Sequence, residues 1–151
     1  MTSPIPFRLS PERLQAQLAG FNARDEIEWF GFEGAFLAPG SASIGFARLR
    51  QGALGGGGVA AINGGVIAAG FDAAFVLAGL GHYETDVVVT LDLSVKFLSL
   101  ARADTPLAFR AHAMRSARNF CFVEGALVSL QDPAGSAFAM ATGMVAPAYR
   151  T

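Results

Sequence analysis

The pattern of apolar and polar residues changes along the chain and divides it into three parts. Residues 28–37 and 41–50 are two apolar runs separated by a Pro-Gly dipeptide, which predicts a β-hairpin. Residues 64–80 are apolar on nearly every helical face, and this indicates a long helix buried on most sides. From residue 88 onward the pattern becomes typical of strands.

The strand pattern is clearest in residues 88–97, where the odd positions are apolar and the even positions from 90 to 96 are polar. Such alternation predicts a strand with one buried face. Three further strands are predicted at 106–117, 119–131 and 135–146, and Asp-Pro-Ala-Gly forms a turn between the last two. Short connections between these strands favour antiparallel pairing.

A short helix is predicted before the hairpin. Ser10 followed by Pro11 is typical of an N-cap and first helical position, and the helix is expected to run to about Leu18 and end at Gly20. Residues 51–58, with four consecutive glycines, are predicted to be a loop.

These elements predict an α+β fold in which an antiparallel sheet of about six strands wraps around one long central helix. No internal repeat or linker is evident, so residues 1–151 are interpreted as one domain with a core at about 28–147.

Composition supports a folded chain and argues against several classes of partner. Of 151 residues, 52% are apolar and 15% are charged, so the chain can bury a core. The mean hydropathy of +0.42 is high, which favours further burial between subunits. The net charge of −1 provides no basic field for nucleic acid. With one cysteine and no apolar N-terminal stretch, a cytoplasmic location without an internal disulfide is expected.

Residues 59–81 are apolar for long enough to span a bilayer. However, they contain Asn63 and Asp72, and an aspartate near the centre would cost roughly 2.5–3.5 kcal/mol on insertion. A buried helix without a membrane partner is therefore preferred.

Asp72 is the first candidate for chemistry. Its neighbours in sequence are alanine, glycine, phenylalanine and valine, and aspartate is rarely buried without a partner. Because burial of a carboxylate costs free energy unless it is paired or protonated, such a residue often marks a functional site. A structural aspartate satisfied by one arginine or by backbone N–H groups is the alternative that the sequence leaves open.

Asn63, Gly64 and Gly65 form the second candidate, at the start of the long helix. Asparagine is a favoured N-cap, and glycine permits close approach of the backbone. The free N–H groups and positive dipole end suit a carbonyl that develops negative charge, as in an oxyanion hole. An ordinary N-cap after a flexible loop is the alternative.

Gly64-Gly65, the apolar stretch and the Asp72 segment together resemble the hotdog-fold thioesterases of the phenylacetate-degradation type. The signature of that family is His-Gly-Gly at the start of the central helix, with a catalytic aspartate nine residues after the histidine. Asn63 and Asp72 have this spacing. Residues 89–98 and 118–125 resemble two later strands of the family, and the similarity covers about residues 30–147.

The resemblance implies a hotdog fold and hydrolysis of acyl-CoA thioesters, with Asp72 as general base or nucleophile. It implies that Gly65 N–H and Asn63 polarise the carbonyl and that Gly64 contacts substrate. Thr90 stands where some members have a hydroxyl residue that assists the attacking water. The departure is Asn63 in place of histidine, because an amide donates a hydrogen bond but does not transfer protons near neutral pH.

Spacing along the helix also predicts an assembly. Asp72 lies seven residues after Gly65, roughly 10 Å along the axis, whereas both must approach one reacting carbon within about 3 Å. We therefore expect the two groups to come from different subunits of at least a homodimer, as the family forms, or of a homotetramer.

Other signals are weaker. Arg115 and Arg118 are candidates for binding the phosphates of coenzyme A, or they are ordinary exposed residues of a turn. The glycines of 56–61 match a dinucleotide motif formally, but strands rather than a βαβ unit follow. Residues 82–86 contain several metal-ligand types, yet a solvated connection is preferred, and no metal or cofactor is predicted.

The sequence thus predicts an acyl-CoA thioesterase whose substrate is linked to coenzyme A or to an acyl carrier. Two alternatives remain, a binding module that retains the acyl-thioester pocket without catalysis, and another hotdog enzyme such as a dehydratase. A dehydratase normally needs a histidine base, and neither His82 nor His112 is well placed in the sequence.

Overall fold

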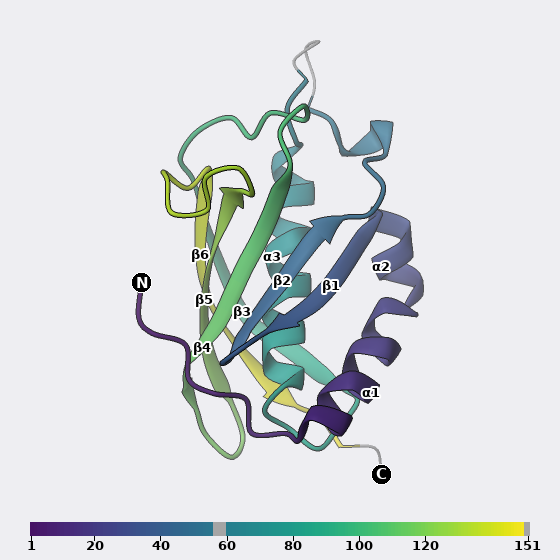
Figure 1. Cartoon of the computed structure of the whole chain (residues 1–151), viewed down its shortest axis with the longest axis vertical. Helices are drawn as coiled ribbons and strands as arrows, with labels where there is room; N and C mark the ends of the chain where they lie inside the picture. The colour runs from purple at the N-terminus through teal and green to yellow at the C-terminus, as the bar shows by residue number, and fades with distance from the viewer. Residues whose placement is uncertain (56–59, 150–151) are drawn as a thin grey trace.

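One long helix lies against a six-stranded antiparallel sheet that curves around it. The computed structural model describes residues 1–55 and 60–149. The central helix α3, Gly64–Leu80, runs along the concave side of the sheet (Figure 1). This arrangement confirms the predicted α+β architecture and matches the hotdog fold.

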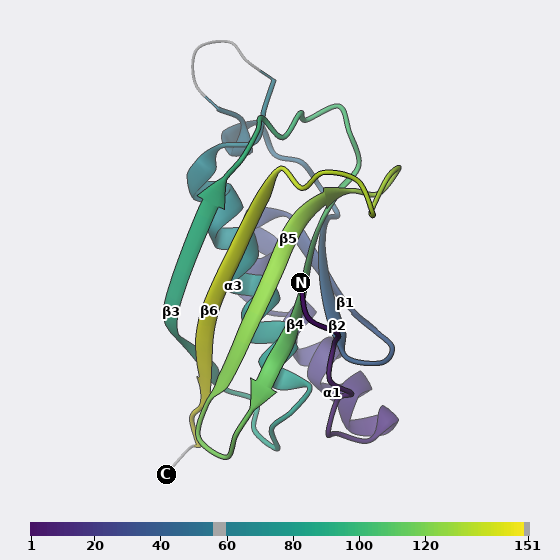
Figure 2. The same ribbon diagram turned by 90° about the vertical axis from the view of Figure 1, so that its left-hand side faces the viewer.

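The six strands hydrogen-bond in the order β1-β2-β4-β5-β6-β3, and every neighbouring pair is antiparallel. Two strands therefore have a free edge, β1 at one side and β3 at the other (Figure 2). Their bounds are Phe32–Leu37 (β1), Ser41–Phe46 (β2), Val88–Phe97 (β3), Leu107–Ser116 (β4), Cys121–Ser129 (β5) and Ala139–Pro147 (β6).

The first predicted strand is partly wrong, because residues 28–30 belong to a helix. Helix α2, Asp25–Phe30, carries three acidic residues in its first turn, where the helix dipole favours negative charge. It ends at Gly31, whose φ of 72° is left-handed. A Cβ there would lie 2.0 Å from the Arg48 carbonyl oxygen, so this turn needs glycine.

Helix α1, Pro11–Asn22, begins as predicted, with the Ser10 hydroxyl accepting the Arg13 N–H at 3.2 Å. It continues past the predicted end at Gly20. The Asn22 side chain instead ties the end of the helix to β1, since it donates to the Gly34 carbonyl at 3.1 Å and accepts the Gly34 N–H at 2.8 Å.

The predicted glycine loop begins with a short 3-10 turn, η1, Gln51–Ala53. The glycines at 56–58, and with them most of the dinucleotide-like motif of 56–61, lie outside the described residues.

The core forms where the inner face of α3 meets the sheet. Phe71 and Phe75 on α3 and Phe109 on β4 are fully buried, and each such ring contributes roughly 2–3 kcal/mol through burial. A Cβ on Gly70 would lie 2.2 Å from the Phe109 ring, so a glycine at this position lets α3 approach β4 closely. Close packing of this face leaves the opposite face of α3 for Asp72, the one polar side chain of this helix.

In the part of the chain that the structure describes, no helix is long and apolar enough to cross a membrane.

Candidate active site

Asn63 is held firmly at the start of α3. Its Oδ1 accepts the Gly65 N–H at 2.7 Å, and its own backbone N–H donates to the Ala53 carbonyl at 2.7 Å. The preceding Ile62 N–H donates to the Ala101 carbonyl at 2.9 Å. Because Oδ1 is the cap acceptor, the exposed side chain has its Nδ2 group, with two N–H donors, left for a ligand.

This cap changes which backbone donors are free. The family resemblance implies that the Gly65 N–H polarises the substrate carbonyl, but Asn63 Oδ1 accepts this N–H in the single chain. The first N–H groups of a helix lack partners within the helix, and no hydrogen bond from the Gly64 N–H is found within residues 1–55 and 60–149. The Gly64 N–H and Asn63 Nδ2 are therefore donors at this end, next to the positive end of the helix dipole.

Asp72 lies on the outer face of α3, two turns further on. It is exposed in the single chain, so the prediction of a buried aspartate is wrong for one subunit. Its Oδ1 accepts a hydrogen bond of 2.5 Å from the Thr90 hydroxyl on β3. The pair brings together two residues that are eighteen positions apart and that the family resemblance implies for one site.

A β-bulge in β3 turns Thr90 toward the helix. The pairing of β3 with β6 shifts register between Thr90 and Asp92, so Leu91 is the extra residue. Thr90 consequently faces α3 before the bulge, and Leu93 and Val95 pack against the core after it. The simple alternation predicted for 88–97 is therefore wrong at its start, where Leu91 is 55% exposed.

One chain does not bring the two halves of the candidate site together. Asn63 and Asp72 are on the same helix, with Asp72 roughly 10 Å along the axis from Gly65. A small cavity of about 80 Å³ borders Asp72 on the side of α2, and its other lining residues include Arg24, Phe30 and Val76.

Arg115 and Arg118 lie far from the start of α3 in the single chain. They are exposed, at the end of β4 and in the turn that leads to β5. This turn, between β4 and β5, is at the opposite end of the molecule from the start of α3 (Figure 1 and Figure 2). Arg8 joins them there, with its guanidinium donating to the Ser116 carbonyl at 2.8 Å.

The histidines and the cysteine do not form a second catalytic arrangement. His82 is buried beyond the end of α3, and the pKa of its ring is lowered to about 4, first by burial and then by Arg8. His112 Nε2 lies 3.1 Å from a carboxylate oxygen of Glu124. Burial raises the pKa of the Cys121 thiol to about 12, so this residue is not an activated nucleophile. Among the described residues there is no group of three potential metal ligands.

The sequence matches the family model described as the thioesterase superfamily over residues 60–136. This segment contains Asn63, Asp72 and Thr90. The chain belongs to the thioesterase superfamily.

Solved structures agree with this assignment at the level of the fold. The PaaI protein of the Escherichia coli phenylacetic acid degradation operon is 16% identical, with a TM-score of 0.77 over 93% of this chain and 96% of that one. A variant of the phenylacetic acid degradation protein PaaI from Thermus thermophilus is 24% identical, with a TM-score of 0.68 over 83% of this chain and 100% of that one. A variant thioesterase from Pseudomonas aeruginosa is 16% identical, with a TM-score of 0.73 over 94% of this chain and 97% of that one.

No protein with a curated description matches the sequence.

Proposed function

We propose that the chain hydrolyses acyl thioesters of coenzyme A or of an acyl carrier. The observation that carries the proposal is the 2.5 Å bond between the Thr90 hydroxyl and Asp72, on the exposed face of a helix that Asn63 caps. A carboxylate held by a hydroxyl and a cluster of N–H donors are the two groups that acyl transfer to water needs. Membership of the thioesterase superfamily supports the same chemistry.

The proposal requires two chains, paired through the free edge of β3. This edge exposes apolar side chains at Val89, Leu91 and Phe97, which are 42%, 55% and 57% exposed. An exposed apolar edge strand favours pairing with another strand, and a two-fold axis makes such pairing antiparallel.

The register of this pairing follows from two contacts between β3 and α3. Thr90 bonds Asp72, while a Cβ on Gly64 would lie 3.4 Å from the Phe97 ring, so the two ends of β3 mark the two halves of the site. A two-fold axis near residues 93 and 94 sets Thr90 of one subunit opposite Phe97 of the other. Asp72 of one subunit then approaches the start of α3 of the second subunit.

In the proposed reaction the thioester carbonyl oxygen accepts hydrogen bonds from Asn63 Nδ2 and the Gly64 N–H. Asp72 of the other subunit, as general base, removes a proton from water while the water oxygen bonds the carbonyl carbon. The tetrahedral intermediate then collapses, the carbon–sulfur bond breaks, and the thiolate leaves and takes up a proton.

Asp72 as nucleophile is the second route to the same products. The carboxylate displaces the thiolate and forms a mixed anhydride, which water then cleaves. Thr90 positions the carboxylate in both routes. No metal or other cofactor takes part in either route.

The test is thiol release from short, long and aromatic acyl-CoAs by the wild-type protein and by Asp72→Asn. Loss of a positioned acid or base costs about 10²–10⁴-fold in rate, so we expect a loss of kcat in this range with folding and assembly unchanged. Asp25→Asn removes the same charge from another exposed helical position and should keep full activity.

A binding module without catalysis is the second candidate, favoured by an asparagine where the family has histidine. It predicts no turnover of any acyl-CoA, together with saturable binding of a thioether analogue that Asp72→Asn leaves unchanged. Turnover that is indifferent to Asp72→Asn would refute the proposed catalytic role.

A further inference from the structure

A second and larger cavity lies beside the start of α3, on the side away from β3. Its volume is about 270 Å³, and its lining residues are Trp29, Phe30, Arg50, Gly52, Ala53 and Val66. Since a cavity of about 150 Å³ is enough to bind benzene, this one has room for a short acyl chain or a ring.

The cavity is attached to the candidate site through the backbone. Val66 belongs to the first turn of α3, and the Ala53 carbonyl accepts the Asn63 N–H at 2.7 Å. The cavity and the donors of the candidate site therefore share the first turn of α3 and the end of η1.

Trp29 forms an unusual wall of the cavity. It is the only tryptophan in the chain, and it is 74% exposed on the short helix α2. The large apolar surface of an indole gains free energy when a ligand covers it. A ligand in the cavity would cover part of it.

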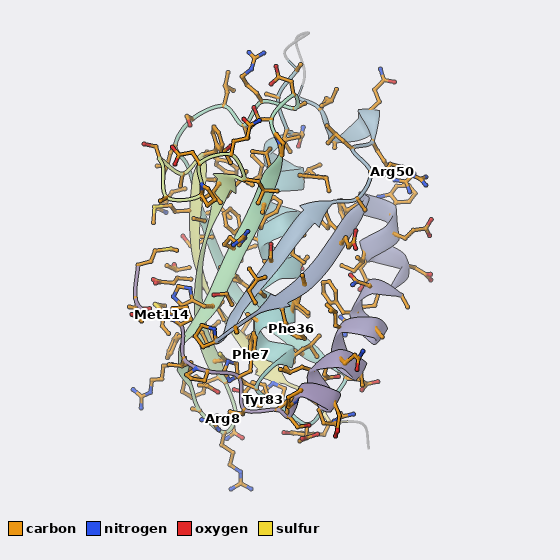
Figure 3. All side chains as sticks on the ribbon, viewed as in Figure 1. Phe7, Arg8, Phe36, Arg50, Tyr83 and Met114 are labelled. Carbon is orange, nitrogen blue, oxygen red and sulfur yellow. The ribbon has the colours of Figure 1, made fainter. Side chains whose placement is uncertain are left out.

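Arg50 is the only charged residue that lines this cavity. It lies at the same end of the molecule as α2, opposite to Arg8 and Tyr83 (Figure 3). One of its terminal nitrogens donates to the Glu28 carbonyl at 3.1 Å, which fixes the guanidinium at the rim.

The guanidinium retains capacity for an anion. The Arg50 side chain is 39% exposed, and among residues 1–55 and 60–149 the bond to the Glu28 carbonyl is the hydrogen bond found for its guanidinium, so terminal N–H donors remain for a ligand. The Glu28 carboxylate is 4.0 Å away and its side chain is 81% exposed, so this ion pair is weak. Arginine binds a carboxylate through two parallel N–H donors, and an apolar cavity with one such group selects an apolar ligand that ends in a carboxylate.

We propose that this cavity is the acyl pocket and that it selects acyl groups with a carboxylate at the far end, namely half-thioesters of dicarboxylic acids. The acyl chain lies against Phe30, Ala53 and Val66 under the Trp29 indole, and its distal carboxylate binds Arg50. The assignment of the pocket to the acyl group depends on the proposed function, whereas the preference for a distal carboxylate does not.

The first experiment compares adipyl-CoA with hexanoyl-CoA, which have the same chain length and differ only in a terminal carboxylate or methyl group. A charge-assisted bidentate contact should raise kcat/KM for adipyl-CoA about 10-fold or more over hexanoyl-CoA. Arg50→Met should remove this preference while changing hexanoyl-CoA hydrolysis by less than about threefold, and Arg50→Lys should restore part of it.

The second experiment measures binding without chemistry, using Trp29 fluorescence. The thioether analogues 5-carboxypentyl-CoA and hexyl-CoA should both change the emission saturably, with about 10-fold tighter binding of the carboxylated analogue in the wild type. Arg50→Met should make the two affinities equal. Because the wild type alone gives the main comparison, the test does not depend on the folding of a variant.

The two proposals fail in different ways. Hydrolysis that depends on Asp72 but shows no preference for adipyl-CoA would overturn the pocket assignment and leave the proposed function standing. Tighter binding of 5-carboxypentyl-CoA without hydrolysis of any thioester would overturn the proposed function and leave the preference for a distal carboxylate standing. Equal affinity of the wild type for the two analogues would contradict selection by Arg50. So would an equal fall in kcat/KM for adipyl-CoA and hexanoyl-CoA in Arg50→Met.

Discussion

Asn63 combines two roles that a histidine at this position would not combine in the same way. Its Oδ1 caps α3 through the Gly65 N–H, and its Nδ2 carries two N–H donors that the cap does not use. The departure from the family signature therefore removes proton transfer but preserves both the helix start and a hydrogen-bond donor. The two roles reside on different atoms, so they can be separated by substitution.

Asn63→Asp is expected to keep the cap and lose the donor. Aspartate is as good an N-cap as asparagine, so the free energy of unfolding should not fall. The carboxylate no longer donates to the thioester oxygen and repels its developing charge, so kcat should fall about 10²–10³-fold. Thermal unfolding and thiol release measure the two effects. A variant that is stable and fully active would exclude Asn63 from the oxyanion site.

His82 gives the protein a dependence on pH that is independent of the candidate site. The ring is buried beside Phe7, with 5.5 Å between ring centroids, and neither nitrogen has a partner in the described part of the chain. Phe7, Tyr83 and Phe36 lie in the same lower part of the molecule (Figure 3). Burial and Arg8 lower the pKa of His82 from its ordinary 6.5 to about 4.

The unfolded chain therefore binds a proton at His82 between about pH 6.5 and pH 4 that the folded chain does not bind. Stability due to this residue is full above about pH 6.5 and falls as the pH is lowered toward 4. His82→Leu should flatten this part of the curve in urea unfolding at a series of pH values. An equal slope in wild type and His82→Leu would exclude this source.

At the scale of elements, glycines set how closely α3 approaches the sheet. Gly70 faces the Phe109 ring, whereas a Cβ on Gly20 in α1 would meet nothing within 4 Å. Both glycines are helical, so they share the gain in helix propensity that alanine brings. They differ only in whether the added methyl group has space.

Gly20→Ala should therefore stabilise the protein by about 0.5–1 kcal/mol. Gly70→Ala should destabilise it by about 1–2 kcal/mol, because overpacking costs more than the helix gains. Urea unfolding of the two variants beside the wild type checks both signs. If Gly70→Ala left the free energy of unfolding unchanged, the Phe109 ring would have to move aside, although Phe32, Phe46 and Phe71 surround it.

The elements with a strong period could be predicted from the sequence, and those that depend on packing could not. Residues 64–80 are helical as predicted because apolar residues recur on all sides of the segment, and this requires burial in any fold. Helix α2 was missed, since six residues are too few to show a helical period and its Trp29 and Phe30 also suit a strand. The bulge at Leu91 depends on pairing with β6 and leaves no local sign.

The candidate site shows the same division. Asn63, Asp72 and Thr90 could be named from the sequence because their spacing matches the family signature, and the Thr90–Asp72 bond agrees with that choice. The loss of the Gly65 N–H to the cap depends on a rotamer, and the exposure of Asp72 depends on which face of α3 the single chain leaves uncovered. Trp29 and Arg50 were not selected, because a cavity between α2, η1 and α3 is a tertiary feature.

At the scale of the whole molecule, the apolar edge of β3 connects the composition to the site. The chain is 52% apolar, yet Val89, Leu91 and Phe97 remain exposed along one free strand. In the proposed dimer this strand pairs with its copy, so that Asp72 of one subunit approaches the start of α3 of the other. A site with Asn63 from one subunit and Asp72 from the other leads to a prediction that a site within a single chain does not.

Two inactive variants should restore activity when they share a dimer. In a mixed pair of Asp72→Asn and Asn63→Asp subunits, one site combines the unchanged Asn63 of the first with the unchanged Asp72 of the second. The other site carries both substitutions. Random pairing makes half of the dimers mixed, so remixed subunits should recover about a quarter of wild-type activity.

The control is the double variant Asp72→Asn/Asn63→Asp remixed with wild type under the same unfolding and refolding. Each mixed dimer then has two damaged sites, so activity should come only from the wild-type pairs, again about a quarter. Recovery in the first mixture, with each variant inactive alone, requires that the two residues act across subunits. If both residues acted within one chain, the first mixture would stay inactive, while the second would retain about half the activity, from every intact wild-type chain.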